Sequence, residues 1–266
     1  MKNLNKTRFL VDISYSNLIT IEREDLKKYK WYMETNPVDP RYLNPTDIID
    51  SHHKSVLDYA KGVTVGITDF VEMAVKLYLA VRDGIRYDPY SPFYLPEHYR
   101  ASYVLKQGRS FCVPKASLLC ALGRACGIPS RVGLATVRNH LATKQLIDFL
   151  GTDLFVSHGF VEFYLEGRWI KATPAFNREL CRKHNVSPLE FNGREDSLFQ
   201  PYNLENQKFM EYVAFEGIFA DIPVKQIVAG WKKAYGEDRV NSWIKKFEED
   251  GEHSLSSFED EDVLNE

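Results

Sequence analysis

Residues 113–126 carry apolar or small side chains on almost every side of a helix, and they constrain the fold more than any other segment. A helix with so little polar surface is stable only where protein surrounds it. The helix ends at Gly127-Ile128-Pro129, because glycine suits a helix C-cap and proline cannot continue a helix. The sequence therefore predicts a buried central helix with the rest of the chain packed around it.

The segments on either side of this helix predict an α+β fold. Residues 69–86 have apolar side chains at three- and four-residue spacing, and Asp69 and Glu72 suit an N-terminal capping box. Residues 158–173 have the pattern of two β-strands joined by a turn, which predicts a β-hairpin. We expect a helical N-terminal part whose buried central helix packs on a small antiparallel sheet. The other predicted strands cover residues 9–13, 130–137 and 210–215, and the other predicted helices cover residues 22–32, 48–60, 224–235 and 238–247.

The length of the chain predicts one main domain. With 266 residues, 44% of them hydrophobic, the chain can bury one sizeable core. We assign residues 1–247 to a single domain with its core at about residues 69–177. Residues 248–266 contain nine acidic residues and no Lys or Arg, so we expect an acidic, solvated and poorly ordered tail.

Charge and motif content exclude several classes of function. The formal net charge of -3 leaves no general basic field for nucleic acid or an anionic membrane. No segment has the length of a transmembrane helix or the features of a signal peptide, so we expect a cytoplasmic protein. The four cysteines form no CxxC pair, and no HExxH, EF-hand or phosphate-loop spacing occurs. We therefore expect no metal, no cofactor and no disulfide.

Cys112 stands at the predicted start of the buried helix, followed by Pro114, which suits a first helical turn. A helix N-terminus presents unpaired N–H groups and about half a positive charge, and both favour a thiolate. We therefore expect a lowered pKa for Cys112 and a reactive thiol. Cys120, Cys126 and Cys181 have no such position, and we expect structural roles for them.

His158 lies at the head of the predicted hairpin, in step with Phe160 and Glu162 along one face of the strand. A strand-borne imidazole facing a helix-borne thiol is the arrangement that nucleophilic catalysis needs. Thr173 on the return strand could fix the imidazole tautomer by bonding the ring nitrogen that faces away from the thiol. We expect surface or packing roles for the other histidines, which are His52, His53, His98, His140, His184 and His253.

Taken in order, these segments resemble the transglutaminase-like core, which is shared with papain-like peptidases. The resemblance covers about residues 69–177 and implies a papain-like α+β fold and a cysteine-dependent enzyme. The segments that carry it are Cys112 at the helix start, the Ala- and Leu-rich helix after it, Gly127-Ile128-Pro129-Ser130-Arg131, His158 through Tyr164, and Gly167 through Pro174.

The resemblance implies a role for each residue that matches the family pattern. Cys112 matches the nucleophile and His158 the general base. Thr173 stands where the family usually has Asp, so it can orient the imidazole but cannot stabilise its charged form. Asn177 and Glu162 are the alternatives for this third role.

Other residues near the motifs have two interpretations each. For the oxyanion hole, the backbone N–H of Cys112 is the expected first donor, and Gln107 is either the second donor or a surface glutamine. Arg131 suits a structural ion pair better than substrate binding. The aromatic, proline-rich residues 87–99 are either a packed connection or a wall of the substrate cleft.

Two classes of function follow from these patterns. In the first, a Cys112 thiolate attacks an amide or peptide carbonyl and His158 transfers the proton, giving a thioester acyl-enzyme. Water as acceptor gives a hydrolase (peptidase, amidase or deamidase), which we favour, and an amine as acceptor gives a transglutaminase. In the second, a binding or scaffold protein has kept the fold, as Thr173 in place of Asp suggests. The expected partner is a peptide or amide substrate, and no protein partner is identified.

Overall fold

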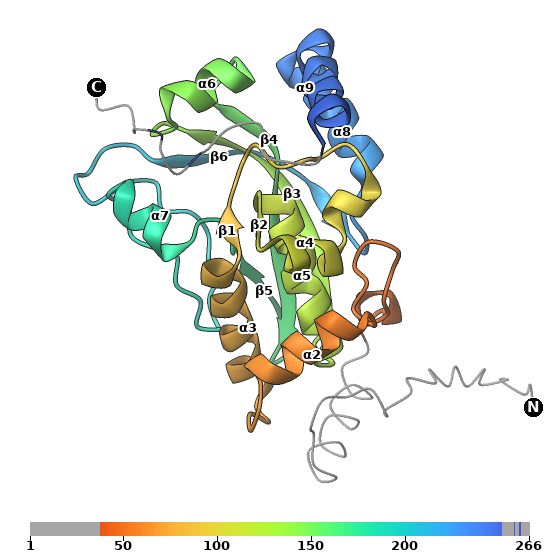
Figure 1. Ribbon diagram of the computed structural model, residues 1–266. Coiled ribbons are helices and arrows are strands. Elements are labelled where there is room, and N and C mark those ends of the chain that lie inside the picture. Colours follow the sequence, from red (N-terminus) through yellow and green to blue (C-terminus); the bar gives the residue numbers. More distant parts are fainter. Residues whose placement is uncertain (1–37, 252–257, 259–260, 262–266) are drawn as a thin grey trace, which may run out of the picture.

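Figure 1 shows the fold in a computed structural model that describes residues 38–251, 258 and 261. The strand and helix expected over residues 9–13 and 22–32 lie outside these described residues. Within them, the main sheet is antiparallel and has the strand order β5-β4-β3-β6. Its strands are β3 (Ser130–Asn139), β4 (Leu154–Leu165), β5 (Arg168–Ala172) and β6 (Met210–Phe219).

β4 and β5 form the hairpin that the sequence predicts. The turn between them places Glu166 and Gly167 at φ values of 48° and 84°, the left-handed region that favours glycine. The chain reaches the central helix through two short parallel strands, β1 (Arg86–Tyr87) and β2 (Arg109–Ser110). The pairing of Tyr87 with Ser110 brings Tyr87 close to the start of the central helix.

The central helix α5 (Cys112–Ala125) is buried at every residue, as predicted. Its charged side chains are compensated by backbone carbonyls. The Lys115 ammonium donates to two carbonyls at the end of the preceding long helix, one of them that of Arg82 at 3.0 Å. The Arg124 guanidinium donates to the carbonyls of three separate segments. Hydrogen bonds thus replace the water that these groups lose on burial.

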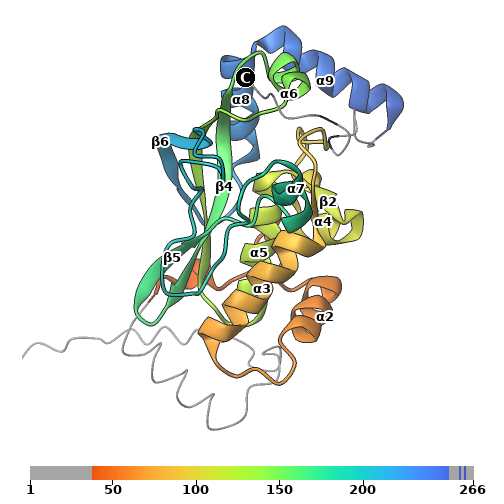
Figure 2. The same ribbon diagram turned by 90° about the vertical axis from the view of Figure 1, so that its left-hand side faces the viewer.

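Helices α2 (Lys54–Val63), α3 (Phe70–Gly84) and α4 (Ala101–Gln107) pack around α5, and α5 lies against β4 and β3. Figure 2 shows these helices on one side of the sheet. α3 begins as predicted, because the Asp69 carboxylate accepts the backbone N–H of Glu72 at 2.9 Å. The predicted α+β class is confirmed.

The remaining elements of the described residues are two 3-10 helices and four α-helices. They are η2 (Pro40–Tyr42), η3 (Pro96–Tyr99), α6 (Lys144–Leu150), α7 (Arg178–Lys183), α8 (Val224–Tyr235) and α9 (Glu237–Asp250). The sequence predicts α8 and α9 but misses α4, α6 and α7, which have only six or seven residues and show no clear helical period. In the described part of the chain, no helix is both long and apolar enough to cross a membrane.

The predicted acidic tail, residues 248–266, differs from expectation where the structure describes it. α9 continues to Asp250. Phe258 and Glu261 are buried, with exposed fractions of 6% and 4%. A solvated tail is therefore wrong for these two residues, because an aromatic side chain among the acidic ones supplies apolar surface to bury. The proposed domain boundary at residue 247 stays a prediction.

Two glycines allow α5 to approach the sheet closely. A Cβ on Gly159 of β4 would lie 2.8 Å from the Cα of Val113. A Cβ on Gly123 of α5 would lie 2.4 Å from Ser130 Oγ and 2.5 Å from a ring carbon of Phe163. These separations are too short for real contacts, so the helix–sheet distance depends on the absence of both side chains.

Replacement of Gly123 by alanine should lower the free energy of unfolding by about 1–3 kcal/mol, because a buried core must shift to admit the methyl group. The matched control is Gly62→Ala at an exposed position of α2, where no atom lies within 4 Å of the added Cβ. That change should stabilise the helix by up to about 1 kcal/mol. Urea unfolding of both variants tests the pair, and equal effects of the two substitutions would contradict the close-packing argument.

Candidate active site

Cys112 is the first residue of α5 and its thiol is surrounded by backbone donors. The N–H groups of Gly159, Val113 and Cys112 itself lie within hydrogen-bonding reach of the sulphur and lower its pKa. Gly159 lies in β4, immediately after His158. The close helix–strand contact therefore brings the predicted nucleophile beside the peptide segment that carries the predicted base.

His158 is 4% exposed, and its Nε2 atom has no hydrogen-bond partner within the described residues. Its ring packs on the ring of Phe199, with 4.9 Å between centroids. Ser157, the residue before it, has a φ of 57°, so β4 is kinked at this point. The imidazole is held by aromatic packing and by the backbone kink, and Nε2 keeps its capacity to accept a proton.

The predicted low pKa of Cys112 is wrong for this structure. Burial is the largest effect and raises the pKa of the Cys112 thiol to about 11, although the backbone donors offset part of the rise. Burial also lowers the pKa of His158 to about 3. Desolvation disfavours both charged forms, so the site holds a neutral thiol and a neutral imidazole. The helix N-terminus is present as expected, but its stabilisation of a thiolate is smaller than the cost of burial.

The predicted hydrogen bond between Thr173 and His158 is not made. Thr173 is 1% exposed, and its Oγ1 has no hydrogen-bond partner of ordinary geometry within the described residues. The hydroxyl lies near the phenol of Tyr212, where it offsets part of the burial-driven rise in that phenol's pKa. The backbone carbonyl of Thr173 accepts the Tyr78 hydroxyl at 3.2 Å. β5 ends at Ala172, so Thr173 has left the strand that would have directed it toward the imidazole.

The alternatives for the third role are occupied elsewhere. Asn177 accepts the backbone N–H of Tyr87 at 3.2 Å. Glu162 forms an ion pair with Arg131, 2.6 Å between nitrogen and oxygen, and a longer one with Lys171. The structural ion pair expected for Arg131 is thus present, and the guanidinium also stacks on Trp169, 3.9 Å from the ring centroid.

Gln107 is exposed at the last residue of α4. The donors that act on the Cys112 thiol are backbone groups, and Gln107 is not among them. Its role as an oxyanion donor stays a prediction.

Glu216 on β6 is a site residue that the sequence analysis misses. Its carboxylate accepts the Ser157 N–H at 2.8 Å, the Ser157 hydroxyl at 2.7 Å and the Thr136 hydroxyl at 2.7 Å. Glu216 therefore fixes the kinked residue before His158, and its charge adds to the burial that raises the pKa of Cys112. No sequence spacing could have identified it, because pairing of β6 with β3 brings it to the site.

α8 also covers the site, although its sequence pattern predicts only a helix and not this position. The Trp231 indole donates to the carbonyl of Val156 at 2.9 Å, and the Tyr235 hydroxyl accepts the N–H of the same residue at 2.8 Å. Trp231 further packs on Phe111, the residue before Cys112, at 5.6 Å between centroids. One helix thus contacts both segments that carry the thiol and the imidazole.

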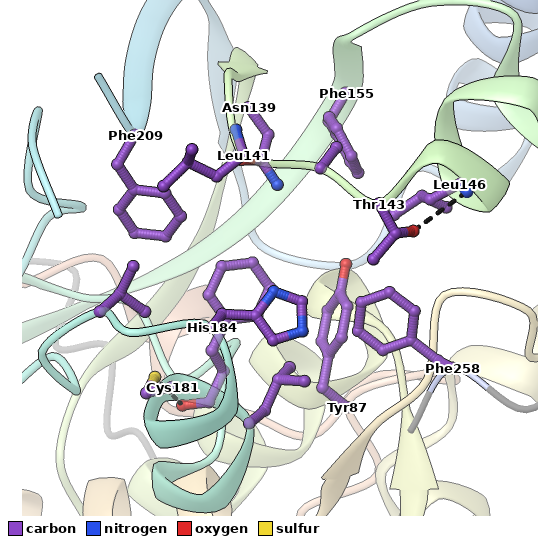
Figure 3. Close-up of a pocket in the computed structure, with 14 residues that line it drawn as sticks. Tyr87, Asn139, Leu141, Thr143, Leu146, Phe155, Cys181, His184, Phe209 and Phe258 are labelled. Atoms are coloured by element: carbon purple, nitrogen blue, oxygen red, sulfur yellow. Dashed lines mark hydrogen bonds between the residues drawn. The ribbon is translucent and has the colours of Figure 1, made fainter. Parts of the chain in front are cut away.

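A small cavity of about 20 Å³ lies next to this site (Figure 3). Tyr87 links the two, because it lines the cavity and lies near enough to Cys112 for the thiol to contribute to its raised pKa, after the larger effect of burial. Among residues 87–99, Tyr87, Tyr90 and Phe93 are buried, so this segment is packed, and Tyr87 also lines the cavity. A wall of a substrate cleft stays a prediction. The other cavity-lining side chains include Thr143, Phe155, Phe176, Cys181, His184 and Phe258.

Part of the chain is similar to a known family. Residues 57–174 match the model of the transglutaminase-like superfamily. These residues form a transglutaminase-like domain. The matched range contains Cys112, His158 and Thr173, and it confirms the expected papain-like, transglutaminase-core fold. In the described residues, no group of three or more His, Cys, Asp or Glu side chains could hold a metal ion.

Two solved structures are similar to part of this chain. One is a protein named as a putative cysteine protease from Cytophaga hutchinsonii, 16% identical, with a TM-score of 0.41 over 68% of this chain and 55% of that chain. Another is the periplasmic domain of TgpA from Pseudomonas aeruginosa, 17% identical, with a TM-score of 0.36 over 52% of this chain and 48% of that chain. The match spans about half the length of each. Curated proteins give no significant match.

The buried neutral imidazole predicts that the protein loses stability in mild acid. His158 has a pKa of about 3 in the folded protein and near 6.5 when unfolded, so the unfolded chain binds a proton that the folded chain does not. Stability should therefore fall as the pH falls from 6.5 toward 3, by about 2 kcal/mol at pH 5 from this residue alone. Urea unfolding at pH 7 and pH 5 measures the change.

The control for this prediction is His158→Gln, which removes the titrating group. His184, whose pKa burial lowers to about 4, adds a loss of the same sign, so the variant should keep part of the pH dependence. An unchanged difference between pH 7 and pH 5 in His158→Gln would show that His158 is not buried in its neutral form.

The raised pKa of Cys112 predicts slow alkylation of the native protein. At pH 7.5, iodoacetamide should modify Cys112 at least tenfold more slowly than a free thiol of pKa about 8.5, because the thiolate fraction is small. The rate should rise as the pH approaches 11. Mass spectrometry of each cysteine peptide, with urea-unfolded protein as the reference, measures this. Fast modification of Cys112 below pH 8 would contradict this prediction and would support a lowered pKa for the Cys112 thiol.

Proposed function

We propose that this transglutaminase-like domain catalyses acyl transfer from an amide or peptide through a thioester on Cys112, with water as the acceptor. The observation that supports it most is the position of the sulphur, at the N-terminus of α5 and among the N–H groups of Cys112, Val113 and Gly159. His158 precedes Gly159 in β4. A nucleophile, a base and backbone donors are thus carried by a single helix–strand contact.

In the proposed reaction, Cys112 Sγ attacks the carbonyl carbon as His158 takes the thiol proton. The tetrahedral intermediate collapses with cleavage of the C–N bond, and His158 returns the proton to the leaving amine. Water, activated by the same imidazole, then hydrolyses the thioester and regenerates the thiol. The unpartnered Nε2 of His158 and the N–H groups around the sulphur support these two roles.

Two observations favour a second candidate, a binding protein that has kept the fold. Thr173 makes no hydrogen bond to His158, and burial raises the pKa of Cys112 to about 11. Without an acidic partner the imidazolium lacks its usual stabilisation, which in triads that lose their Asp lowers turnover by about 10⁴. An amine in place of water as the acceptor would make the domain a transglutaminase.

Replacement of Cys112 by serine should abolish turnover of a glutamine-containing peptide library, by at least about 10³-fold, because serine lacks the nucleophilicity of a thiol. The matched control is Cys120→Ser, which makes the same change in the same buried helix and should retain most of the activity. Mass spectrometry of the peptides gives the turnover. Equal activities of the two variants would exclude Cys112 as the nucleophile.

The same library, incubated with and without a labelled amine, separates the candidates. Cleaved or deamidated peptides in both conditions support hydrolysis, and peptides that carry the label support a transglutaminase. Peptides that stay unchanged in every condition favour the binding protein.

A further inference from the structure

Phe258 lies in the aromatic cavity beside the proposed active site, here called the groove, which Tyr87, Thr143 and His184 help to line. Phe258 is 6% exposed, and its ring contacts those of Tyr87, Tyr90 and His184, with centroid distances of 5.6, 6.3 and 5.9 Å. In Figure 3, Phe258 and Tyr87 lie side by side at the cavity. Phe258 lines this cavity, and the space left there, about 20 Å³, has room for about one water molecule. The phenylalanine thus fills most of an aromatic site.

A carboxylate three residues later is bound at the same place. Glu261 is 4% exposed, and its two oxygens accept hydrogen bonds from different elements. Tyr90 donates its hydroxyl to Oε1 at 2.5 Å, and Thr143, the N-cap of α6, donates its hydroxyl to Oε2. The N–H of Glu261 approaches the carbonyl of Phe258 at 3.3 Å, so the backbones of these two residues are in contact. The groove therefore offers an aromatic subsite and two hydroxyl donors placed for one carboxylate.

A continuous row of rings connects this groove to the proposed base. His158 packs on Phe199, Phe199 on Phe176 at 5.1 Å, and Phe176 on Tyr87 at 4.8 Å. Tyr87 in turn contacts Phe258 and lies near Cys112. A peptide that took the place of Phe258 and Glu261 would therefore contact the row of rings that leads to His158.

We propose that this groove is the peptide-binding subsite of the domain and selects a peptide with an aromatic residue followed three residues later by a carboxylate. Phe258 and Glu261 occupy it as an internal ligand and limit access of other peptides. The proposal rests on the proposed function in naming a substrate class, but binding alone tests it.

The probe is a fluorescent peptide with the sequence of residues 252–266, titrated into the full-length protein and followed by fluorescence anisotropy. The double variant Phe258→Ala/Glu261→Gln should bind the peptide at least tenfold more tightly than the unsubstituted protein, because its own tail no longer competes at high local concentration. The control Glu259→Gln removes the same charge and should bind as the unsubstituted protein does. Equal affinity for all three proteins would overturn the proposal.

A second pair of variants tests the carboxylate site without touching the tail. In the double-variant background, Tyr90→Phe keeps the ring and removes the donor to Glu261, so peptide affinity should fall about tenfold. The peptide carrying Glu261→Gln should lose this sensitivity. Tyr59→Phe, whose hydroxyl makes only a 3.5 Å contact in another part of the fold, is the control. Equal effects of Tyr90→Phe on both peptides would overturn the carboxylate assignment.

Effects of the substitutions on folding and on catalysis can be distinguished from their effects on peptide binding. Each variant is first checked by circular dichroism and thermal unfolding, and binding is compared only among folded proteins. The titrations are repeated with Cys112→Ser, which cannot form a thioester and should bind the peptide unchanged. Failure of the proposed function would appear as intact binding without turnover, whereas failure of the subsite would appear in the anisotropy itself.

Discussion

The contact between the N-terminal turn of α5 and β4 is the interaction on which the rest of this structure depends. Gly159 lets the backbone of Val113 approach the strand, and Gly123 makes room for Phe163 two turns or more along the helix. Without these two glycines, a helix that is buried at every residue could not approach the sheet this closely without a steric clash. The same contact brings the Gly159 N–H to the Cys112 sulphur, so packing and the site's chemistry share one geometric cause.

Burial, more than the helix N-terminus, controls the electrostatics of the site. The charge at a helix N-terminus contributes about 1 kcal/mol to a nearby anion. The net rise in the pKa of Cys112 from 9.0 to about 11 corresponds to about 3 kcal/mol in favour of the thiol, after the backbone donors have acted. The sequence places the helix terminus correctly but not the burial, because the covering groups, such as Trp231 and Phe199, come from segments far along the chain.

Local sequence patterns predict those helices and strands that have a long run of periodic apolar residues or a specific turn. α3, α5, α8 and the β4–β5 hairpin follow from apolar spacing, capping residues and Glu166-Gly167, and Cys112 and His158 follow from their places on these elements. The contacts that Glu216 and Phe258 make at the site could not be predicted in this way. Glu216 reaches the site by sheet pairing, and Phe258 is one apolar side chain within an acidic segment. Such long-range contacts leave no periodic signal in the sequence.

In the resting protein, the Cys112 thiol and the His158 imidazole are both neutral, and catalysis must start from this state. With a thiol pKa of about 11 and an imidazole pKa of about 3, moving the proton from sulphur to nitrogen costs about 11 kcal/mol before the new charges attract each other. Two unit charges about 4 Å apart at an effective dielectric constant of about 20 attract by only about 4 kcal/mol, so even a close approach of the two groups would offset less than half of this cost. The neutral pair is therefore the resting form, and a reactive form needs water or substrate dipoles at the sulphur. Phe258 packs on Tyr87, which lies near the thiol, so removal of the Phe258 side chain would expose Tyr87 on that side of the site.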